Sequence, residues 1–198
     1  YDTPKELTPY HHVETRRIHE DMGEYEFTVY GIEGDNSQVT VYAVDIQEIG
    51  GKFHQRLDGF TTVQDRFMLE DFNRDGYIDV RIHKYPGGSM RNEPSMFWLW
   101  DTKQNKYVKN QQLEELSEEN GIRMADDGRL VTHFRVGVWW YGVSHYSYRN
   151  NTFVEMERIE VRPQDENDVT NSGKLQDTYK RINGEMKLVS TEILEEIR

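Results

Sequence analysis

The chain has 198 residues, a formal net charge of -12 and no cysteine. An acidic surface repels phosphate backbones and anionic lipid headgroups, so nucleic acids and membrane surfaces are disfavoured as partners, while basic proteins and divalent cations are favoured. The absence of cysteine excludes disulfides, thiolate nucleophiles and Cys-ligated metals. A hydrophobic content of 35% is low, but 12% of the residues are aromatic, and their large side chains favour a folded, β-rich protein.

The first 23 residues are polar and irregular, which predicts an extended lead-in or linker over 1–23 and a single β-rich domain over 24–198. No run approaches 18 apolar residues, so no transmembrane segment is expected. The chain begins at Tyr1 and not at Met, which indicates that an upstream segment was removed. A signal peptide or a lipid anchor upstream of Tyr1 is compatible with that beginning.

Alternation of apolar and polar residues predicts strands through most of the chain. Tyr25, Phe27 and Val29 share one face of the strand that begins at Glu24. Further strands are predicted over 38–49, 78–83, 96–101, 121–125, 130–140, 143–149, 152–161, 174–182 and 185–193. The last two form a hairpin, because Asn183-Gly184 suits a two-residue type I′ turn.

One segment, 110–121, breaks the β pattern. Leu113 and Leu116 give it one apolar edge, Asn110 is placed as an N-cap and Gly121 as a stop, so a short helix is predicted. Many short antiparallel strands joined by turns indicate an all-β fold: an antiparallel sandwich or propeller-like β-sheets, with one short helix.

The stretch EDFNRDGYIDVRI, residues 70–82, places oxygen-bearing side chains at alternate positions around Gly76. Ca²⁺ takes six to eight oxygen ligands from a flexible set of donors, and a glycine permits the sharp bend that returns the chain around the ion. Position twelve of an EF-hand loop would be a bidentate Glu, but here it is Ile82, so the loop lies between strands and lacks one donor. The expected calcium donors are Asp71, Asn73, Asp75, the backbone carbonyl of Tyr77, and Asp79.

The ion at this loop would be structural, because no open coordination position or general base is evident beside it. Glu70, Asp65 and Asp101 are candidates for the remaining donor. The alternative is an Asx-rich turn without metal, since Asp, Asn and Gly are also ordinary turn residues.

DFNRDGYIDV resembles the D-x-N-x-D-G-x-x-D calcium signature of FG-GAP repeats. The longer arrangement, from Asp65 to Val161, resembles a set of bacterial envelope lipoproteins in which this signature is followed by FWLWD, KYVKNQQLEEL, DDGRLV and an aromatic hairpin. Some members of that set look like periplasmic lysozyme inhibitors that serve as immunity proteins. The resemblance implies an all-β fold, one calcium ion on the loop, residence in the periplasm or at the cell surface, and inhibition of a peptidoglycan hydrolase.

Aromatic residues are concentrated in two strand regions. Most are expected to be core, and the remainder to form a platform for a sugar ring or a protein partner. The candidates for that surface are Trp98, Trp100, Trp139, Trp140 and Tyr141.

The sequence offers no nucleophile elbow, no H-E-x-x-H and no phosphate-binding glycine loop. We therefore expect a non-catalytic, calcium-stabilised protein, secreted or anchored in the envelope, whose partner is a basic protein such as a peptidoglycan hydrolase. A carbohydrate-binding module that uses the Trp/Tyr surface is the alternative, and a hydrolase is the third hypothesis.

Overall fold

The structure is a computed structural model, and it describes residues 8–33, 39–62, 67–84, 94–119, 121–165, 167 and 173–194. The described residues fall into two compact units, the first ending at Glu114 and the second beginning at Glu115. The sequence indicated one domain from residue 24 onward, and the structure differs because the strands of each unit pair only with strands of the same unit. Composition alone does not change at that boundary.

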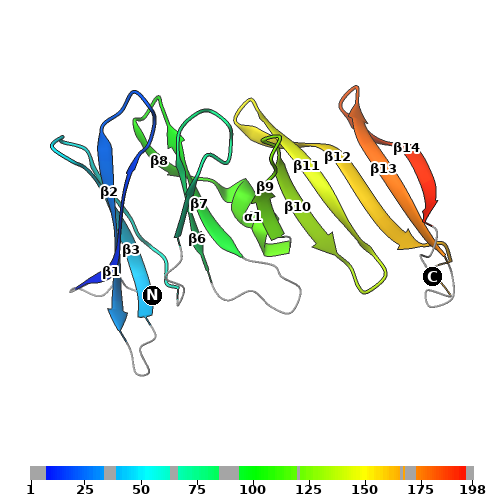
Figure 1. The fold of residues 1–198 in the computed structure, drawn as a ribbon, viewed down its shortest axis with the longest axis horizontal. Coiled ribbons are helices and arrows are strands. Elements are labelled where there is room, and N and C mark those ends of the chain that lie inside the picture. Colours follow the sequence, from blue (N-terminus) through cyan, green and yellow to red (C-terminus); the bar gives the residue numbers. More distant parts are fainter. Residues whose placement is uncertain are drawn as a thin grey trace. The chain divides into compact units, whose positions relative to one another are not determined.

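The first unit begins with an antiparallel sheet in the order β1-β2-β3-β4 (Figure 1). Tyr25, Phe27 and Val29 are all buried on β2, which confirms the predicted face. The strands are β1 (Thr8–Arg17), β2 (Glu24–Glu33), β3 (Val39–Glu48) and β4 (His54–Leu57).

Strand β1 lies inside the segment interpreted as an irregular lead-in, and that interpretation is wrong for Thr8–Arg17. The strand pairs with β2 along its backbone, with Val13 opposite Thr28. Its described side chains from Val13 to Arg17 are mostly exposed. Because this part of the edge strand is held by backbone pairing and presents no buried apolar face, alternation in the sequence does not reveal it. Residues 1–7 of the predicted lead-in lie outside the described residues.

The second sheet of this unit has the order β5-β6-β7-β8, again antiparallel. All five residues of β6 are buried, although the sequence pattern alternates apolar and polar residues there. Both faces of β6 are covered, and the buried Arg81 donates from Nε to Ser95 Oγ at 3.0 Å. The strands are β5 (Phe67–Glu70), β6 (Asp79–His83), β7 (Ser95–Asp101) and β8 (Lys106–Lys109).

These two sheets share one hydrophobic core and form an antiparallel sandwich, the first of the two architectures that the sequence left open. The ring of Phe27 on β2 lies 6.3 Å from that of Phe67 and 6.4 Å from that of Tyr107. The amide of Gln55 on β4 donates to the carbonyl of Tyr107 and accepts from its N–H, both at 2.8 Å. Gln55 therefore pairs with the backbone N–H and C=O groups of Tyr107 on strand β8 and joins the two layers.

The predicted helix is confirmed as α1 (Gln111–Glu119). The side-chain oxygen of Asn110 accepts a hydrogen bond from the N–H of Leu113 at 2.9 Å, which is the N-cap contact the sequence indicated. Leu113 is fully buried. No helix in the described part of the chain is long and apolar enough to cross a membrane.

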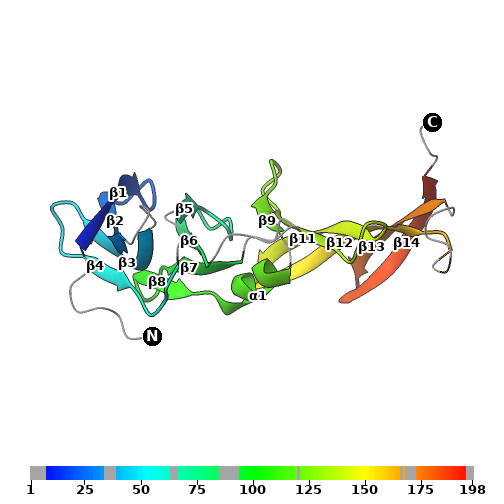
Figure 2. The same cartoon turned by 90° about the horizontal axis from the view of Figure 1, so that it is seen from below.

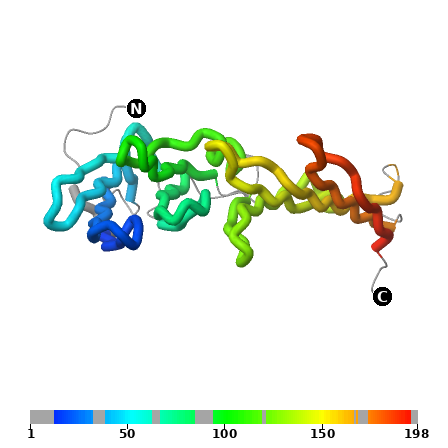
Figure 3. Tube along the Cα trace, turned by 90° about the horizontal axis from the view of Figure 1, so that it is seen from above, coloured from blue at the N-terminus to red at the C-terminus, as the bar shows by residue number. Residues whose placement is uncertain are grey.

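The second unit is a meander in which each strand pairs antiparallel with the next (Figures 1 and 3). Its strands are β9 (Gly121–Met124), β10 (Leu130–Arg135), β11 (Tyr141–Arg149), β12 (Thr152–Pro163), β13 (Lys174–Ile182) and β14 (Glu185–Leu194). Asn183 and Gly184 both have positive φ, 52° and 87°, and join Ile182 directly to Glu185. The predicted two-residue turn with two left-handed residues is therefore present.

Candidate functional site

The acidic loop, residues 71–79, connects β5 to β6 in the first unit. Its first carboxylate organises the bend: Asp71 Oδ1 accepts from the N–H groups of Arg74 and Asp75 at 2.7 and 3.2 Å, and Oδ2 accepts from Gly76 at 2.9 Å. Arg74 and Gly76 have positive φ, 62° and 89°. The glycine at the sharpest point of the loop is therefore used as the sequence predicted.

Asp79 is the most deeply placed member of the loop, with 0% of its surface exposed. Its Oδ2 accepts from the N–H of Phe72 and its Oδ1 from the N–H of Trp100 on β7, both at 2.9 Å. One carboxylate thus joins the start of the loop to the neighbouring strand. Burial raises the pKa of Asp79 well above its ordinary value, and the negative charges of Asp75 and Asp71 raise it further, against those two hydrogen bonds.

Asn73 and Asp75 complete the network inside the loop. Asn73 is 7% exposed, its amide donates to Asp75 Oδ2 at 2.9 Å, and its oxygen accepts from the N–H of Asp75 at 3.1 Å. Asp75 Oδ1 accepts from the N–H of Tyr77 at 2.9 Å. All of the predicted donor residues therefore belong to one hydrogen-bonded loop that is closed at both ends.

The turn after β1 covers this loop, a relationship the sequence did not indicate. The imidazole of His19 stacks on the ring of Tyr77 with centroids 4.4 Å apart, and the N–H of Ile78 donates to the carbonyl of Ile18 at 2.8 Å. A methyl group at Gly76 would lie 3.5 Å from the His19 ring. The loop is thus held from both sides, by β7 below Asp79 and by the β1–β2 turn above Tyr77.

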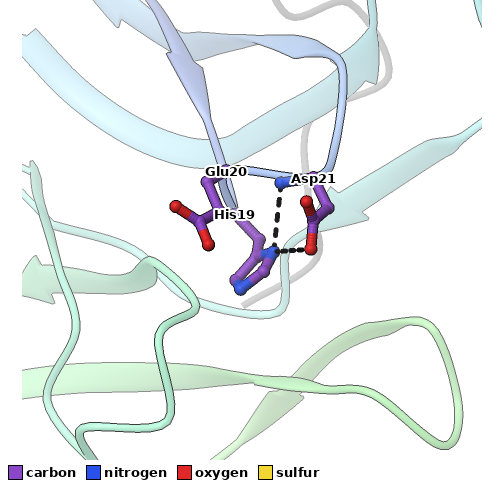
Figure 4. Close-up of side chains that lie close together, drawn as sticks. All are labelled: His19, Glu20 and Asp21. Atoms are coloured by element: carbon purple, nitrogen blue, oxygen red, sulfur yellow. Dashed lines mark hydrogen bonds and ion pairs between the residues drawn. The ribbon is translucent and has the colours of Figure 1, made fainter.

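His19, Glu20 and Asp21 form a second polar cluster at that turn (Figure 4). Their ligand atoms lie within 4.8 Å of one another, and no other group of three or more His, Asp or Glu among the described residues is so close. Nδ1 of His19 accepts from the N–H of Asp21 at 3.2 Å, and Glu20 and Asp21 are exposed. The cluster stabilises the turn through a local hydrogen bond, and the nitrogen donor makes it a poorer match to Ca²⁺ than the oxygen-only loop.

The other expected donors differ in their placement. Glu70 lies directly opposite Asp79 in the β5–β6 register, so it is better placed than Asp101. Asp101 instead holds the turn after β7, where it accepts from the N–H groups of Lys103 and Gln104 at 2.8 and 3.0 Å. Asp65 lies outside the described residues.

Two of the five aromatic residues predicted for a binding surface are core residues, so the prediction is wrong for Trp98 and Trp100. They are 6% and 3% exposed. Trp100 packs against Tyr107 and Phe53 with ring centroids 5.1 and 5.5 Å away. The sandwich covers this face of β7 with the β1–β4 sheet, and the opposite face is buried as well.

Trp139, Trp140 and Tyr141 lie at the end of the β10–β11 hairpin in the second unit. Both tryptophans are half-buried, and Lys174 Nζ lies 5.3 Å from the centre of the Trp139 ring. Tyr141 is 39% exposed and borders a groove of about 1020 Å³ whose lining includes Val143, Ile159 and Val161. The structure therefore leaves this part of the predicted aromatic surface accessible.

Comparison with solved structures identifies one similar fold. A Xanthomonas protein, described as a type IV secretion system related protein, superposes with a TM-score of 0.63 and 20% sequence identity, over 90% of this chain and 98% of that one. At this identity the similarity is evidence for a shared fold. No protein-family model and no curated protein matches the chain.

Proposed function

We propose that this chain is a non-catalytic, calcium-stabilised binding protein of the bacterial envelope that captures and inhibits a basic cell-wall hydrolase. The observation that carries the proposal is the buried carboxylate of Asp79, which sits in one loop with Asp71 and Asp75. No described Lys or Arg forms an ion pair with any of the three. A buried carboxylate without a cation is costly, and a bound dication would remove that cost.

Calcium fits the chemistry of this loop. Asp71, Asn73, Asp75 and Asp79 offer carboxylate and amide oxygens, and the carbonyl of Tyr77 would add a backbone oxygen. The ion would supply two positive charges to carboxylates that otherwise repel one another. Because Asp79 also holds the N–H of Trp100, a bound ion would fasten β5, β6 and β7 together and act as a structural group.

The net charge of -12 favours a basic partner. Complementary charge accelerates the encounter of two proteins and makes it sensitive to salt. The Xanthomonas neighbour carries a secretion-related description, which agrees with a protein of the bacterial envelope. An envelope setting also supplies the millimolar calcium that weak extracellular sites need.

A binding experiment with a basic lysozyme tests the partner. The calcium-loaded chain is expected to capture and inhibit the enzyme with a Kd between nanomolar and micromolar, weakened at least about tenfold between 50 and 500 mM NaCl. An acidic lysozyme of the same fold serves as the control. Absence of inhibition across a panel of basic peptidoglycan hydrolases would contradict this function.

A carbohydrate-binding module is the second candidate, favoured by the accessible Trp139, Trp140 and Tyr141 beside the groove. Chitin or peptidoglycan oligosaccharides are then expected to shift the tryptophan emission of the chain, and Trp139→Ala with Trp140→Ala to abolish the shift. The two remaining tryptophans, Trp98 and Trp100, are buried. If the double variant still shows the emission shift, the shift does not come from the hairpin, and this result would contradict sugar binding there.

A further inference from the structure

The second unit contains one described sheet, which carries an apolar strip on one face, and no second described sheet of the same unit packs on that strip. The other two sheets belong to the first unit, and β10–β14 form a single twisted layer (Figure 2). Sheets with an apolar face ordinarily bury it against another layer. We call the side that carries Arg135, Tyr141, Val143, Ile159 and Val161 the Arg135 face, because these residues share one side of the strands.

The Arg135 face is accessible at its hairpin end and apolar at its centre. Tyr141 is 39% and Val138 65% exposed, and Val143 and Ile159 are partly exposed, while Val161 is largely covered. These residues belong to the lining of the groove of about 1020 Å³. An apolar strip of this kind at a sheet centre is a typical site for another protein surface.

The charges at the two ends of this face are opposite. The register places Arg135, Tyr141, Val161, Gln176 and Glu192 in one row across β10–β14, each directly beside the next. Arg135 therefore stands two strands to one side of β12, and Glu192 two strands to the other side. In the part of the chain that the structure describes, neither forms an ion pair; the Arg135 Nε donates to the carbonyl of Gly137 at 2.8 Å.

We propose that a second copy of this chain covers the Arg135 face in a symmetric dimer whose two-fold axis lies between the two copies of β12 and bisects their directions. That rotation places Ile159 and Val161 against their own copies and Arg135 of one chain against Glu192 of the other, twice. An interface of this kind is self-complementary, as two-fold symmetry requires. It also gives the single layer the second sheet it lacks. The inference is independent of the loop and of the proposed partner.

The dimensions agree with such a contact. Strands are spaced about 4.8 Å apart, so Arg135 and Glu192 lie roughly 10 Å on either side of β12. Packed sheets are about 10 Å apart and rotated by about 30°, which displaces those positions by roughly 5 Å. The combined length of an arginine and a glutamate side chain spans that distance, and the pair can form a bidentate bond.

Two rows away from Val161, past the row of Ile159, Glu157 would meet its own copy at the axis in a like-charge contact. Each Glu157 already has two cations of its own chain, with Arg129 NH1 at 3.3 Å and Lys180 Nζ at 3.5 Å. These cations neutralise the carboxylate before the copies approach. The charge at the axis therefore does not oppose the pairing of Arg135 with Glu192.

Sedimentation of the full chain tests this dimer. The wild-type protein is expected to reach twice its 23.6 kDa mass as concentration rises. Arg135→Glu and Glu192→Arg should each weaken dimerisation by about tenfold or more, and the double variant should regain the wild-type Kd within about threefold. Arg149→Glu, the same charge change at the far end of β11, should leave the Kd unchanged. A wild-type chain that stays monomeric up to millimolar concentration, or a double variant no better than the singles, would overturn the proposal.

A cross-linking experiment keeps the test independent of those charge changes. The chain has no cysteine, so a single Ile159→Cys variant can be treated with a short bismaleimide. Dimers are expected from that variant and not from Leu188→Cys. Leu188 is 53% exposed and pairs with Tyr179, whose side lies opposite the Arg135 face. Equal cross-linking of the two variants would contradict a face-specific dimer.

Discussion

Replacing Asp79 by alanine should destabilise the first unit even without any metal. The change leaves the N–H groups of Phe72 and Trp100 buried without an acceptor. Each unsatisfied buried donor costs about 1 to 3 kcal/mol, so the expected loss is about 2 to 6 kcal/mol. Asp79→Asn keeps one side-chain oxygen as acceptor and should lose about half as much.

Urea unfolding in the presence of a chelator measures this loss. A background with Trp139→Phe and Trp140→Phe restricts the tryptophan fluorescence to Trp98 and Trp100, which both lie in the first unit. The midpoint then reports the unit that contains Asp79. A loss below about 1 kcal/mol for Asp79→Ala would refute the assignment of this carboxylate as the acceptor that joins the loop to β7.

Two other contacts give further predictions. Asn110→Ala removes the cap on α1 and should cost about 0.5 to 2 kcal/mol in urea unfolding followed by circular dichroism, while Asn110→Asp should cost much less. Asp177 is 1% exposed; burial pushes its pKa up, but hydrogen bonds from Thr191 and Arg162 outweigh burial and hold that pKa below the ordinary carboxyl value. The charged Asp177 therefore contributes to the free energy of unfolding above the ordinary carboxyl pKa, and this contribution is lost as the pH falls through the lower pKa of the folded state. The difference in melting temperature between wild type and Asp177→Asn should therefore narrow as the pH is lowered from 6 to 2. A gap that does not change with pH would contradict the role given to the Asp177 charge.

Features specified by neighbouring residues could be predicted from the sequence. The cap of α1 needs only Asn110 before a helical segment, and the β13–β14 turn needs only Asn183-Gly184 between two alternating runs. The acidic loop is of the same kind, because the hydrogen bonds to its Asp and Asn side chains join residues at most seven positions apart, with the bond from Trp100 to Asp79 as the exception. The face of β2 was also predictable, since one side of that strand faces the core and the other faces solvent.

Features that depend on distant layers could not be predicted. The sequence cannot show that both faces of β7 are covered, so Trp98 and Trp100 resembled candidates for a binding surface. Strand β1 pairs with β2 through its backbone, and its side chains from Val13 to Arg17 are mostly exposed, so its sequence resembles a linker. The contact of His19 with Tyr77 joins segments that are far apart along the chain, and only the closure of the sandwich brings them together.

The boundary between the two units was missed for a related reason. Both units are built from short antiparallel strands with the same kinds of residues, so no change of composition marks residue 115. The difference is architectural: the first unit buries two sheets against each other, and the second is one meander. That contrast is also the reason the Arg135 face is left for a second copy.

The central claim is that the acidic loop holds one calcium ion. Equilibrium dialysis of chelator-stripped protein against radioactive calcium measures this directly, with Asp58→Ala as a matched control because Asp58 is an exposed acid outside the loop. The wild type and the control are expected to bind one ion per chain with a Kd of roughly 0.1 to 1 mM or tighter, and Asp75→Ala to bind none in that range. Wild-type protein that retains no calcium at millimolar concentration, or Asp75→Ala that binds as well as wild type, would contradict it.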